Sequence, residues 1–273
     1  MNLQEKLKKL ENILRDMKGF AVAFSGGVDS SLLLKVASTL EEVEVVAVTI
    51  HAAVHAGFEI EEARELGEDL QVDHRIIPLE VLDHHAFKDH PVDRCYHCKK
   101  VVFTRIFEEA HSLGLDFVAD GSNVDDISDY RPGLKALEEL SVRSPLKEAG
   151  LTKAEIRSLS ADYGMTTATK PAYACLATRI PYHQQVFKED LEKIEKGEVW
   201  LKDQGFEQYR VRLHGDAARI EVLPHERARF FNMDFMDQVQ AIFKEFGFAH
   251  VALDLGGYRT GSMNVGIPEG TEA

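Results

Sequence analysis

The 273-residue sequence lacks any run of about 18 or more apolar residues, which a membrane-spanning helix would require. Its first six residues are mainly polar and offer no apolar core of a signal peptide. We therefore expect a cytoplasmic protein without a membrane partner. Hydrophobic residues still make up 44% of the chain, which is ordinary for a globular protein with a core.

Basic side chains are fewer than acidic ones. The chain has 32 Lys and Arg and 46 Asp and Glu, which gives a formal net charge of −14. Nucleic-acid binding needs a basic surface that neutralises phosphates, so no such partner is expected. Cysteine is scarce as well, and the odd count of three does not make a disulfide framework. Two form Cys95-Tyr96-His97-Cys98 and the third is Cys175, which indicates metal binding, redox chemistry or catalysis.

Short apolar runs alternate with amphipathic segments between residues 18 and 165. The expected strands are 20–24, 43–50, 72–79 and 115–119, and the expected helices are 2–17, 29–37, 58–70, 99–113, 132–140 and 152–163. Thr152 and Glu155 match a capping box at the start of the last helix. This alternation predicts an α/β fold, a parallel twisted sheet with helices on both faces.

The pattern changes in the last third of the chain. A charged helix is expected over 187–204, two strands joined near Gly215 over 209–213 and 218–223, a helix near 235–246 and a strand over 250–255. We therefore predict two domains, an α/β domain over 1–183 and a smaller α+β domain over 184–273 that serves substrate binding or assembly. Residues 266–273 are expected to be a frayed tail.

A polar loop, Ser25-Gly26-Gly27-Val28-Asp29-Ser30-Ser31, follows the first expected strand. Its glycines permit a tight turn and close backbone approach, and amides at a helix N-terminus attract phosphate oxygens. Asp29 would repel a phosphate unless Mg²⁺ lay between them. The competing interpretation is a plain turn in which Asp29 or Ser30 caps the helix. Ligands of open α/β sheets bind at the carboxyl ends of strands, which favours the phosphate site.

This loop resembles that of the N-type ATP-pyrophosphatases, the PP-loop superfamily with an adenine nucleotide α-hydrolase-like fold. The resemblance implies that ATP is cleaved to AMP and pyrophosphate while an oxygen of the substrate is adenylylated, and that a nucleophile then displaces AMP. It also implies a set of ATP- and pyrophosphate-binding residues: Ser25, Gly26, Gly27, Val28, Asp29, Ser30, Ser31, Gly121, Asn123 and Asp125.

Further segments of the sequence indicate one family within this superfamily. They are Cys95 to Lys99, Asp120 to Asp126, Asp129 to Gly133, Arg143 to Leu146, Lys170-Pro171, Cys175 to Tyr182, and Gly257 to Ser262. Together they resemble the ATP-dependent sulfur transferases that build the nickel-pincer nucleotide cofactor, the LarE family, over about residues 15–265. The resemblance implies that a carboxylate of pyridinium-3,5-biscarboxylic acid mononucleotide is adenylylated and converted to a thiocarboxylate.

The cysteines leave the source of sulfur open. In family members that have only the equivalent of Cys175, this residue surrenders its own sulfur. Members with all three cysteines are thought to hold a 4Fe–4S cluster with one open iron that carries an extra sulfide. The resemblance thus implies a cluster on Cys95, Cys98 and Cys175, fed by a sulfide source. A zinc site, a redox-active CxxC pair and a sacrificial Cys175 are the alternatives.

Several residues are candidates for binding the anionic substrate. Tyr96 offers a ring for stacking, and Glu198 interrupts the apolar face of the helix expected over 187–204. Arg210 and Arg212 alternate along one strand and share a face. Arg179 and Arg259 complete the set, because both lie in the family-like segments. The competing interpretations are packing for Tyr96, a helix end near Gly197 for Glu198, and a solvent-facing surface for the strand arginines.

Two other classes of function compete with sulfur transfer. A PP-loop enzyme could amidate a carboxylate or thiolate tRNA, and the first would not need Cys175, whereas the second needs a basic patch. A non-catalytic nucleotide-binding or metal-storage protein would bind ATP without releasing AMP. We also expect a homo-oligomer.

Overall fold

The computed structural model describes residues 1–128, 132–171 and 173–259. Its contacts divide the chain into two compact units, Met1–Val81 with Asp93–Tyr173, and Leu82–Val92 with Ala174–Ala273. Three segments discussed above lie wholly or partly outside the described residues: 129–131 of the Asp129 segment, 260–262 of the Gly257 segment, and the expected tail over 266–273.

The first unit is built on a four-stranded parallel sheet. Its strands are β1 (Gly19–Ala23), β2 (Glu44–His51), β3 (Asp73–Pro78) and β4 (Phe117–Ala119). Their order is β3-β2-β1-β4, and all three neighbouring pairs are parallel. The chain steps from β1 outward to β2 and β3 and then returns to the other side of β1. This arrangement confirms the predicted parallel α/β sheet and places a topological switch point between β1 and β4.

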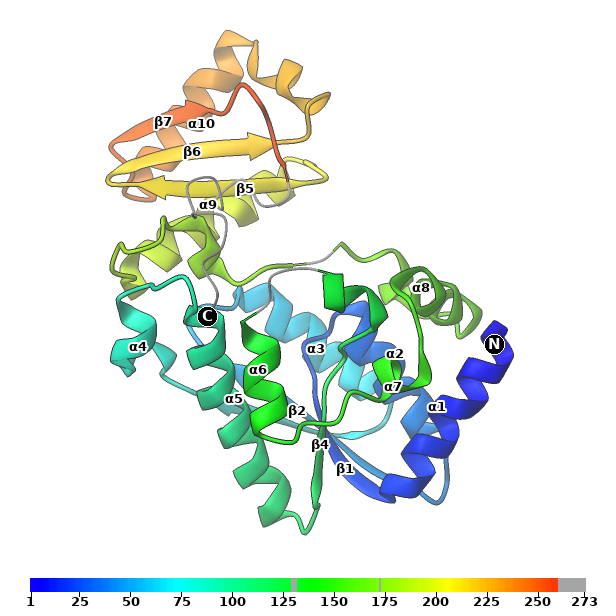
Figure 1. The fold of residues 1–273 in the computed structure, drawn as a ribbon. Coiled ribbons are helices and arrows are strands. Elements are labelled where there is room, and N and C mark those ends of the chain that lie inside the picture. The colour runs from blue at the N-terminus through cyan, green and yellow to red at the C-terminus, as the bar shows by residue number, and fades with distance from the viewer. Residues whose placement is uncertain (129–131, 172, 260–273) are drawn as a thin grey trace. The chain divides into compact units, whose positions relative to one another are not determined.

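Helices cover both faces of this sheet (Figure 1). One face carries α1 (Leu3–Met17), α2 (Val28–Ser38), α3 (Gly57–Asp69), α7 (Pro145–Ala149) and α8 (Lys153–Asp162). The opposite face carries α5 (Arg94–Ser112) and α6 (Gly133–Glu139). Phe20 and Val22 of β1 join the buried cluster formed with the helices of the first face. The predicted capping box at Thr152 and Glu155 is present at the start of α8.

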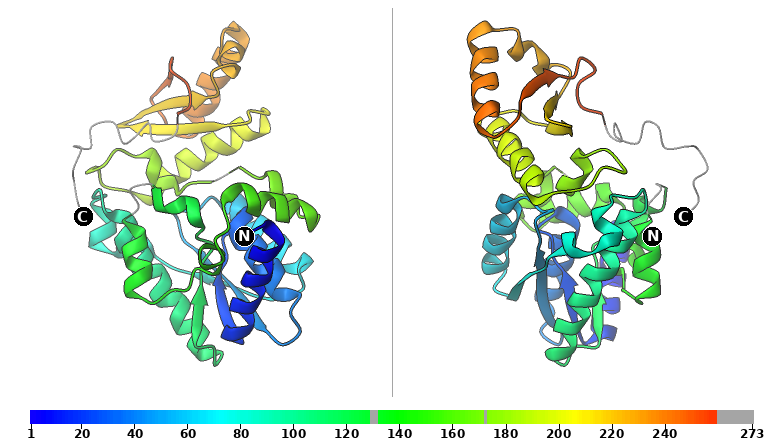
Figure 2. Two further views of the ribbon diagram at one scale, coloured as in Figure 1. Left: turned by 45° about the vertical axis from the view of Figure 1, so that its right-hand side comes forward. Right: turned by 90° about the vertical axis from the view of Figure 1, so that its left-hand side faces the viewer.

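The second unit is α+β, as expected. Strands β5 (Tyr209–His214) and β6 (Ala217–Val222) are antiparallel, and β7 (His250–Leu253) pairs with β6 in parallel. Helices α9 (Lys188–Asp203) and α10 (Met233–Glu245) cover one face of this sheet (Figure 2). A Cβ on Gly197 would lie 3.0 Å from the Phe243 ring and 3.2 Å from Val211 Cγ2. The two helices and β5 therefore pack together at this glycine.

Short elements make up the remaining regular structure. They are η1 (Val81–Asp83), α4 (His85–Lys88), η2 (Val124–Ser128), η3 (Thr166–Thr169), η4 (Leu176–Arg179) and η5 (Glu226–Phe230).

The unit boundary differs from the one drawn on the sequence. It falls between Tyr173 and Ala174 rather than after residue 183, and the segment Leu82–Val92 belongs to the second unit. Backbone hydrogen bonds explain this, since the amide of His183 donates to His90 O at 2.9 Å and that of Val186 donates to Lys88 O at 3.1 Å. Pairing between segments about ninety residues apart leaves no trace in local composition.

Helix α9 matches the expected helix over 187–204, whereas helix α5 begins earlier than expected. Helix α5 begins at Arg94 rather than near residue 99, so the CxxC pair lies in its first turns. No glycine or proline follows Pro91 until Gly114, so nothing stops the helix from starting early. Helix α9 continues through Gly197 to Asp203, and the alternative of a helix end at this glycine is wrong.

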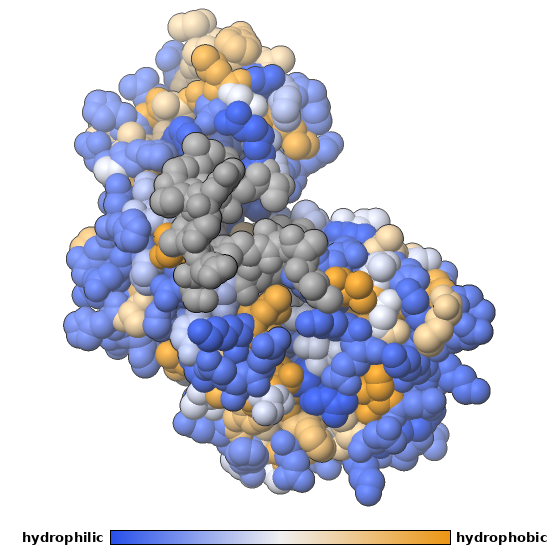
Figure 3. Space-filling view, in the orientation of Figure 1, coloured by the Kyte–Doolittle hydropathy of each residue, from blue (hydrophilic) through white to orange (hydrophobic). Residues whose placement is uncertain are grey.

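The surface is mostly hydrophilic on the face shown in Figure 3. Among the described residues, three exposed apolar side chains gather at η5 and the start of α10, namely Phe231, Met233 and Met236. No helix in the described ranges is long and apolar enough to cross a membrane.

Side chains tie the first three strands together just before the loop 25–31. Thr49 Oγ1 donates to Phe24 O at 2.6 Å and lies 2.8 Å from His74 Nε2. Because a hydroxyl has one proton and a carbonyl only accepts, His74 Nε2 donates to Thr49. A Cβ on Gly67 of α3 would lie 2.5 Å from His74 Nδ1, so this glycine makes room for the imidazole.

We predict that Gly67→Ala lowers the free energy of unfolding by about 1–3 kcal/mol, because the new methyl group overpacks against His74. The loss is expected although alanine favours a helix interior by about 1 kcal/mol over glycine. Urea unfolding measures it. In a His74→Ala background the same change should stabilise the protein, and an equal loss in both backgrounds would contradict the steric explanation.

Candidate functional site

The loop 25–31 joins β1 to α2 and forms the phosphate-binding candidate. Gly26 has a φ of +66°, and a Cβ there would lie 3.1 Å from that of Ala63, so both conformation and space require glycine. Gly27 is the N-cap of α2 and makes no side-chain capping bond. Neither Asp29 nor Ser30 is the cap, so the capping interpretation of the loop is wrong. Amides of the first turn lack intrahelical acceptors and suit an anion.

Serine hydroxyls hold the loop in shape. Ser30 Oγ donates to Gly27 O at 3.2 Å, and it accepts from the amide of Ser25 at 3.3 Å. Ser25 Oγ lies 3.2 Å from Ser30 Oγ. The hydroxyls of the predicted set therefore organise the turn itself. Ser31 is fully buried, and its amide donates to Gly27 O at 3.0 Å.

Asp29 lies in the first turn of α2 and is held from two other elements. Asn123 Nδ2 donates to Asp29 Oδ1 at 3.2 Å. The ammonium group of Lys153, the first residue of α8, forms an ion pair with Asp29 Oδ2. Asp125 accepts from the amide of Lys153 at 2.7 Å, and its own amide donates to Asn123 Oδ1 at 2.9 Å. The structure thus brings together Asp29, Asn123 and Asp125 of the predicted set.

The segment after β4 packs directly against the start of α2. A Cβ on Gly121 would lie 2.8 Å from Ser30 N, which only glycine avoids. Asp120 is 6% exposed and accepts from Ser122 Oγ at 2.5 Å and from Ser144 Oγ at 2.7 Å. These bonds fix the carboxylate beside the loop, at the switch point of the sheet.

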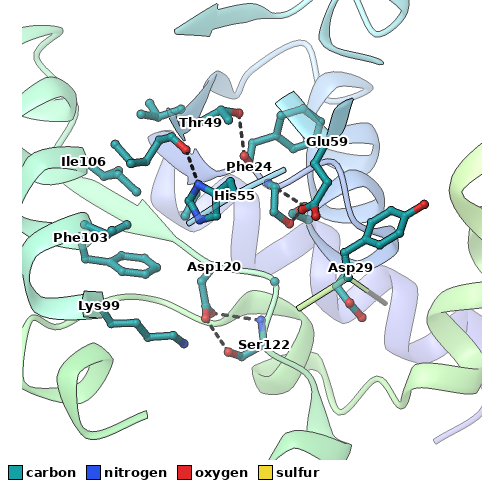
Figure 4. A pocket seen from close by; sticks show the side chains of 18 of the residues that line it. Phe24, Asp29, Thr49, His55, Glu59, Lys99, Phe103, Ile106, Asp120 and Ser122 are labelled. Carbon is teal, nitrogen blue, oxygen red and sulfur yellow. Dashed lines mark hydrogen bonds between the residues drawn. The ribbon is translucent and has the colours of Figure 1, made fainter. Parts of the chain in front are cut away.

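A pocket of about 710 Å³ opens in front of these residues (Figure 4). Its polar part is lined by Ser25, Asp29, Ser30, Asp120, Gly121, Ser122, Asn123, Asp125, Asp126 and Lys153. Its apolar part includes Val48, Ile50, Ile60, Val102, Phe103 and Ile106. One end therefore suits phosphates and the other a planar apolar ring, within the size range of small-ligand sites.

Cys98 lines this pocket, whereas Cys95 is exposed. Tyr96, between them, is not part of the pocket lining. Its hydroxyl donates to Glu139 Oε2 at 2.8 Å, and this bond is the main cause that raises the pKa of Tyr96. Lys100 Nζ lies 2.7 Å from the same carboxylate. Tyr96 thus takes part in a surface network with α6.

Cys175 belongs to the second unit and is the residue before η4. Its carbonyl accepts from the amide of Thr178 at 2.9 Å and from Arg179 Nη1 at 3.1 Å. Arg179 also forms a bidentate ion pair with Glu198, at 2.8 and 2.7 Å, and the side chains are 2% and 7% exposed. Glu198 therefore interrupts the apolar face of α9 because it balances a buried arginine beside Cys175.

The other predicted arginines of this unit have different surroundings. Arg212 donates to Thr178 O at 3.0 Å and to the buried Glu221 at 2.9 Å. Arg210 lies over the Tyr258 ring at 5.3 Å, and burial, assisted by Arg179, lowers its pKa. Arg259 is exposed, 3.8 Å from Asp254. Arg210 and Arg212 are thus buried rather than solvent-facing, and their role toward a substrate stays a prediction.

The three cysteines are divided between the units, with Cys95 and Cys98 in the first and Cys175 in the second. Thiolates are the natural ligands of an iron–sulfur cluster, so the donor chemistry fits. In the described part of the chain, however, no group of three His, Cys, Asp or Glu side chains is arranged to hold a metal ion. The cluster therefore stays a prediction.

Sequence reasoning did not name several polar residues that line the pocket, among them His55, Asp120, Ser122 and Lys153. Asp120 and Ser122 lay inside a segment already noted for its family resemblance. Lys153 follows the predicted N-cap of α8, but nothing in its local sequence shows that it meets Asp29. The short, mostly apolar loop after β2 gave no signal for His55.

Comparisons with known proteins support the assignment to the PP-loop superfamily. The family of the queuosine biosynthesis protein QueC matches residues 20–90, which include the loop. A tRNA-specific 2-thiouridylase MnmA of Xanthobacter autotrophicus is 28% identical over 65% of this chain and 56% of its own. An uncharacterised protein of Synechocystis is 34% identical over 96% of this chain and 98% of its own.

A third relative also covers nearly the whole chain. The pyridinium-3,5-bisthiocarboxylic acid mononucleotide synthase of Lactiplantibacillus plantarum is 36% identical over 96% of this chain and 95% of its own length. This similarity spans both units and confirms the resemblance drawn from the motifs. The chain therefore belongs to the family of sulfur-transferring PP-loop enzymes that includes this synthase.

Proposed function

We propose that this protein uses ATP to convert a carboxylate of pyridinium-3,5-biscarboxylic acid mononucleotide to a thiocarboxylate. The observation that carries the proposal is the loop 25–31 at the switch point of the sheet, beside a pocket of about 710 Å³. The full-length similarity to the named synthase supports the choice of substrate. The net charge of −14 argues against a tRNA substrate.

The triphosphate of ATP would lie against the amides of the first turn of α2. There the helix dipole and Lys153 stabilise the negative charge that develops on the leaving pyrophosphate. The substrate carboxylate attacks the α-phosphorus, the bond to pyrophosphate breaks, and an acyl-adenylate forms. A sulfur nucleophile then displaces AMP from the carbonyl carbon and leaves the thiocarboxylate.

Asp29 fits the requirements of Mg²⁺ on a nucleotide. This ion usually takes one or two carboxylates together with phosphate oxygens, and Asp29 presents an oxygen at the mouth of the loop. When bound, Mg²⁺ would neutralise phosphate charge. Lys153 forms an ion pair with Asp29 in the structure. With the nucleotide bound, Lys153 would contact phosphate oxygens and Asp29 would contact Mg²⁺.

Sulfur would enter through the cysteines. We propose Cys175 as the residue that delivers sulfur, and its carbonyl accepts a hydrogen bond from Arg179 of the buried Arg179–Glu198 pair. Passage through a 4Fe–4S cluster on Cys95, Cys98 and Cys175 is the proposed route. Sacrifice of the Cys175 sulfur, with zinc binding or redox chemistry at the CxxC pair, is the alternative. Arg179, Glu198, Arg210, Arg212, Arg259 and Tyr96 are proposed for substrate binding.

We also propose a homo-oligomer. Phe231, Met233 and Met236 are exposed apolar side chains within six residues of the chain, and contact with a second copy would remove them from water. Light scattering of the purified chain tests the state directly.

We predict that Asp29→Asn lowers substrate-dependent pyrophosphate release by about 10²–10³-fold, because the loop loses the carboxylate that would hold the metal on the phosphates. Lys153→Met should lower it by a similar factor through lost charge stabilisation. Asp162→Asn, an exposed aspartate at the end of α8, is the matched control and should keep the parental rate. A rate within twofold of the parent for Asp29→Asn would count against this site.

We predict that anaerobically purified protein carries iron and acid-labile sulfide near cluster stoichiometry and that Cys175→Ala loses both. The reason is that three thiolates are needed to hold the cluster. Elemental analysis and acid-labile sulfide analysis of the two proteins measure whether a cluster is present. Zinc alone would make the CxxC pair structural. Absence of metal, with Cys175 losing the mass of H₂S after turnover, would assign the sacrificial role.

A further inference from the structure

His55 lines the pocket but has no role in the proposed mechanism. It follows β2, and its Nδ1 lies 3.0 Å from Ile50 O. A carbonyl oxygen only accepts, so Nδ1 carries the proton of this bond. The Nε2 of the neutral ring is then an acceptor. Burial, the largest cause, and His51 lower the pKa of His55, which keeps the ring neutral.

The free side of this ring faces the apolar end of the pocket. His55 lines the pocket together with Phe103 and Ile106 of α5, and Figure 4 shows it beside these side chains and away from Asp29. In the described ranges, Nε2 makes no hydrogen bond to the protein. The ring is half-buried on the pocket wall, so this acceptor is open to a ligand that supplies a donor.

We propose that His55 Nε2 accepts a hydrogen bond from the exocyclic amine of the nucleobase and selects 6-aminopurine over 6-oxopurine nucleotides. The inference rests on the proposed function, which places the triphosphate at the loop 25–31 and leaves the apolar end for the base. A 6-oxo group would present a second acceptor to Nε2. The ring cannot become a donor there without giving up the bond to Ile50 O or gaining a proton.

Glu59 is the other acceptor to consider, because its carboxylate also lines the pocket. In Figure 4 it is drawn on the Asp29 side of the pocket, whereas His55 lies among the apolar side chains. We therefore assign the choice of base to His55 and use Glu59→Gln to test the assignment.

The test compares ATP with inosine 5′-triphosphate, which carries oxygen in place of the amine. We expect the parent to prefer ATP by roughly 10- to 100-fold in kcat/KM for pyrophosphate release. His55→Phe keeps an aromatic ring but removes the acceptor. It should lower kcat/KM for ATP, leave kcat/KM for inosine 5′-triphosphate unchanged, and so abolish most of the preference. His55→Gln should retain part of it. His51→Gln, an exposed histidine at the end of β2, is the control and should keep the parental ratio.

An unchanged ratio in His55→Phe, or a ratio that collapses in Glu59→Gln instead, would overturn the assignment. A purely structural role for His55 would lower the use of both nucleotides equally and would overturn it as well. Calorimetric binding of the two nucleotides to the same proteins gives the ratio without turnover. Selective ATP binding by a parent that releases no pyrophosphate would therefore contradict the proposed function alone.

Discussion

The passage of the chain from β1 into α2 is the constraint on which the rest of the first unit depends. Gly26 takes a left-handed conformation against α3, and Gly27 caps α2 without a side-chain bond. The amides of the first turn are consequently left for a ligand. Gly121 then lets the segment after β4 approach the same turn, which is possible because the strand order reverses between β1 and β4.

In this acidic protein, individual ion pairs matter more for the two sites than the net charge does. At the loop, Asp29 forms an ion pair with Lys153, and these are the two charges that we propose to meet the phosphates and their Mg²⁺. In the second unit, Arg179 is buried only because Glu198 meets it with two hydrogen bonds. A buried arginine without that partner would be strongly unfavourable. Its Nη1 also donates to the carbonyls of Ala174 and Cys175, which ties the ion pair to the backbone at the cysteine that we propose for sulfur transfer.

The two units supply different parts of the proposed reaction. The first unit contains the pocket and the CxxC pair. The second unit contains Cys175 and, beside it, the buried Arg179–Glu198 ion pair. The CxxC pair lies in the first turns of α5, and Cys98 lines the pocket. The proposed activation thus uses residues of the first unit, and the proposed sulfur supply uses cysteines of both units.

The sequence by itself determined the parallel α/β class, the loop at the end of β1, the capping box of α8 and the family, because each of these is written in local patterns of period, glycine position or motif. Only the tertiary structure decided that Lys153 meets Asp29, that Glu198 pairs with Arg179, and that residues 82–92 join the second unit. His55 likewise became a candidate only once its Nδ1 was seen to bond Ile50 O. The physical reason is that these contacts join residues whose side-chain directions are set by packing and strand order, and local sequence patterns do not encode which distant groups will meet.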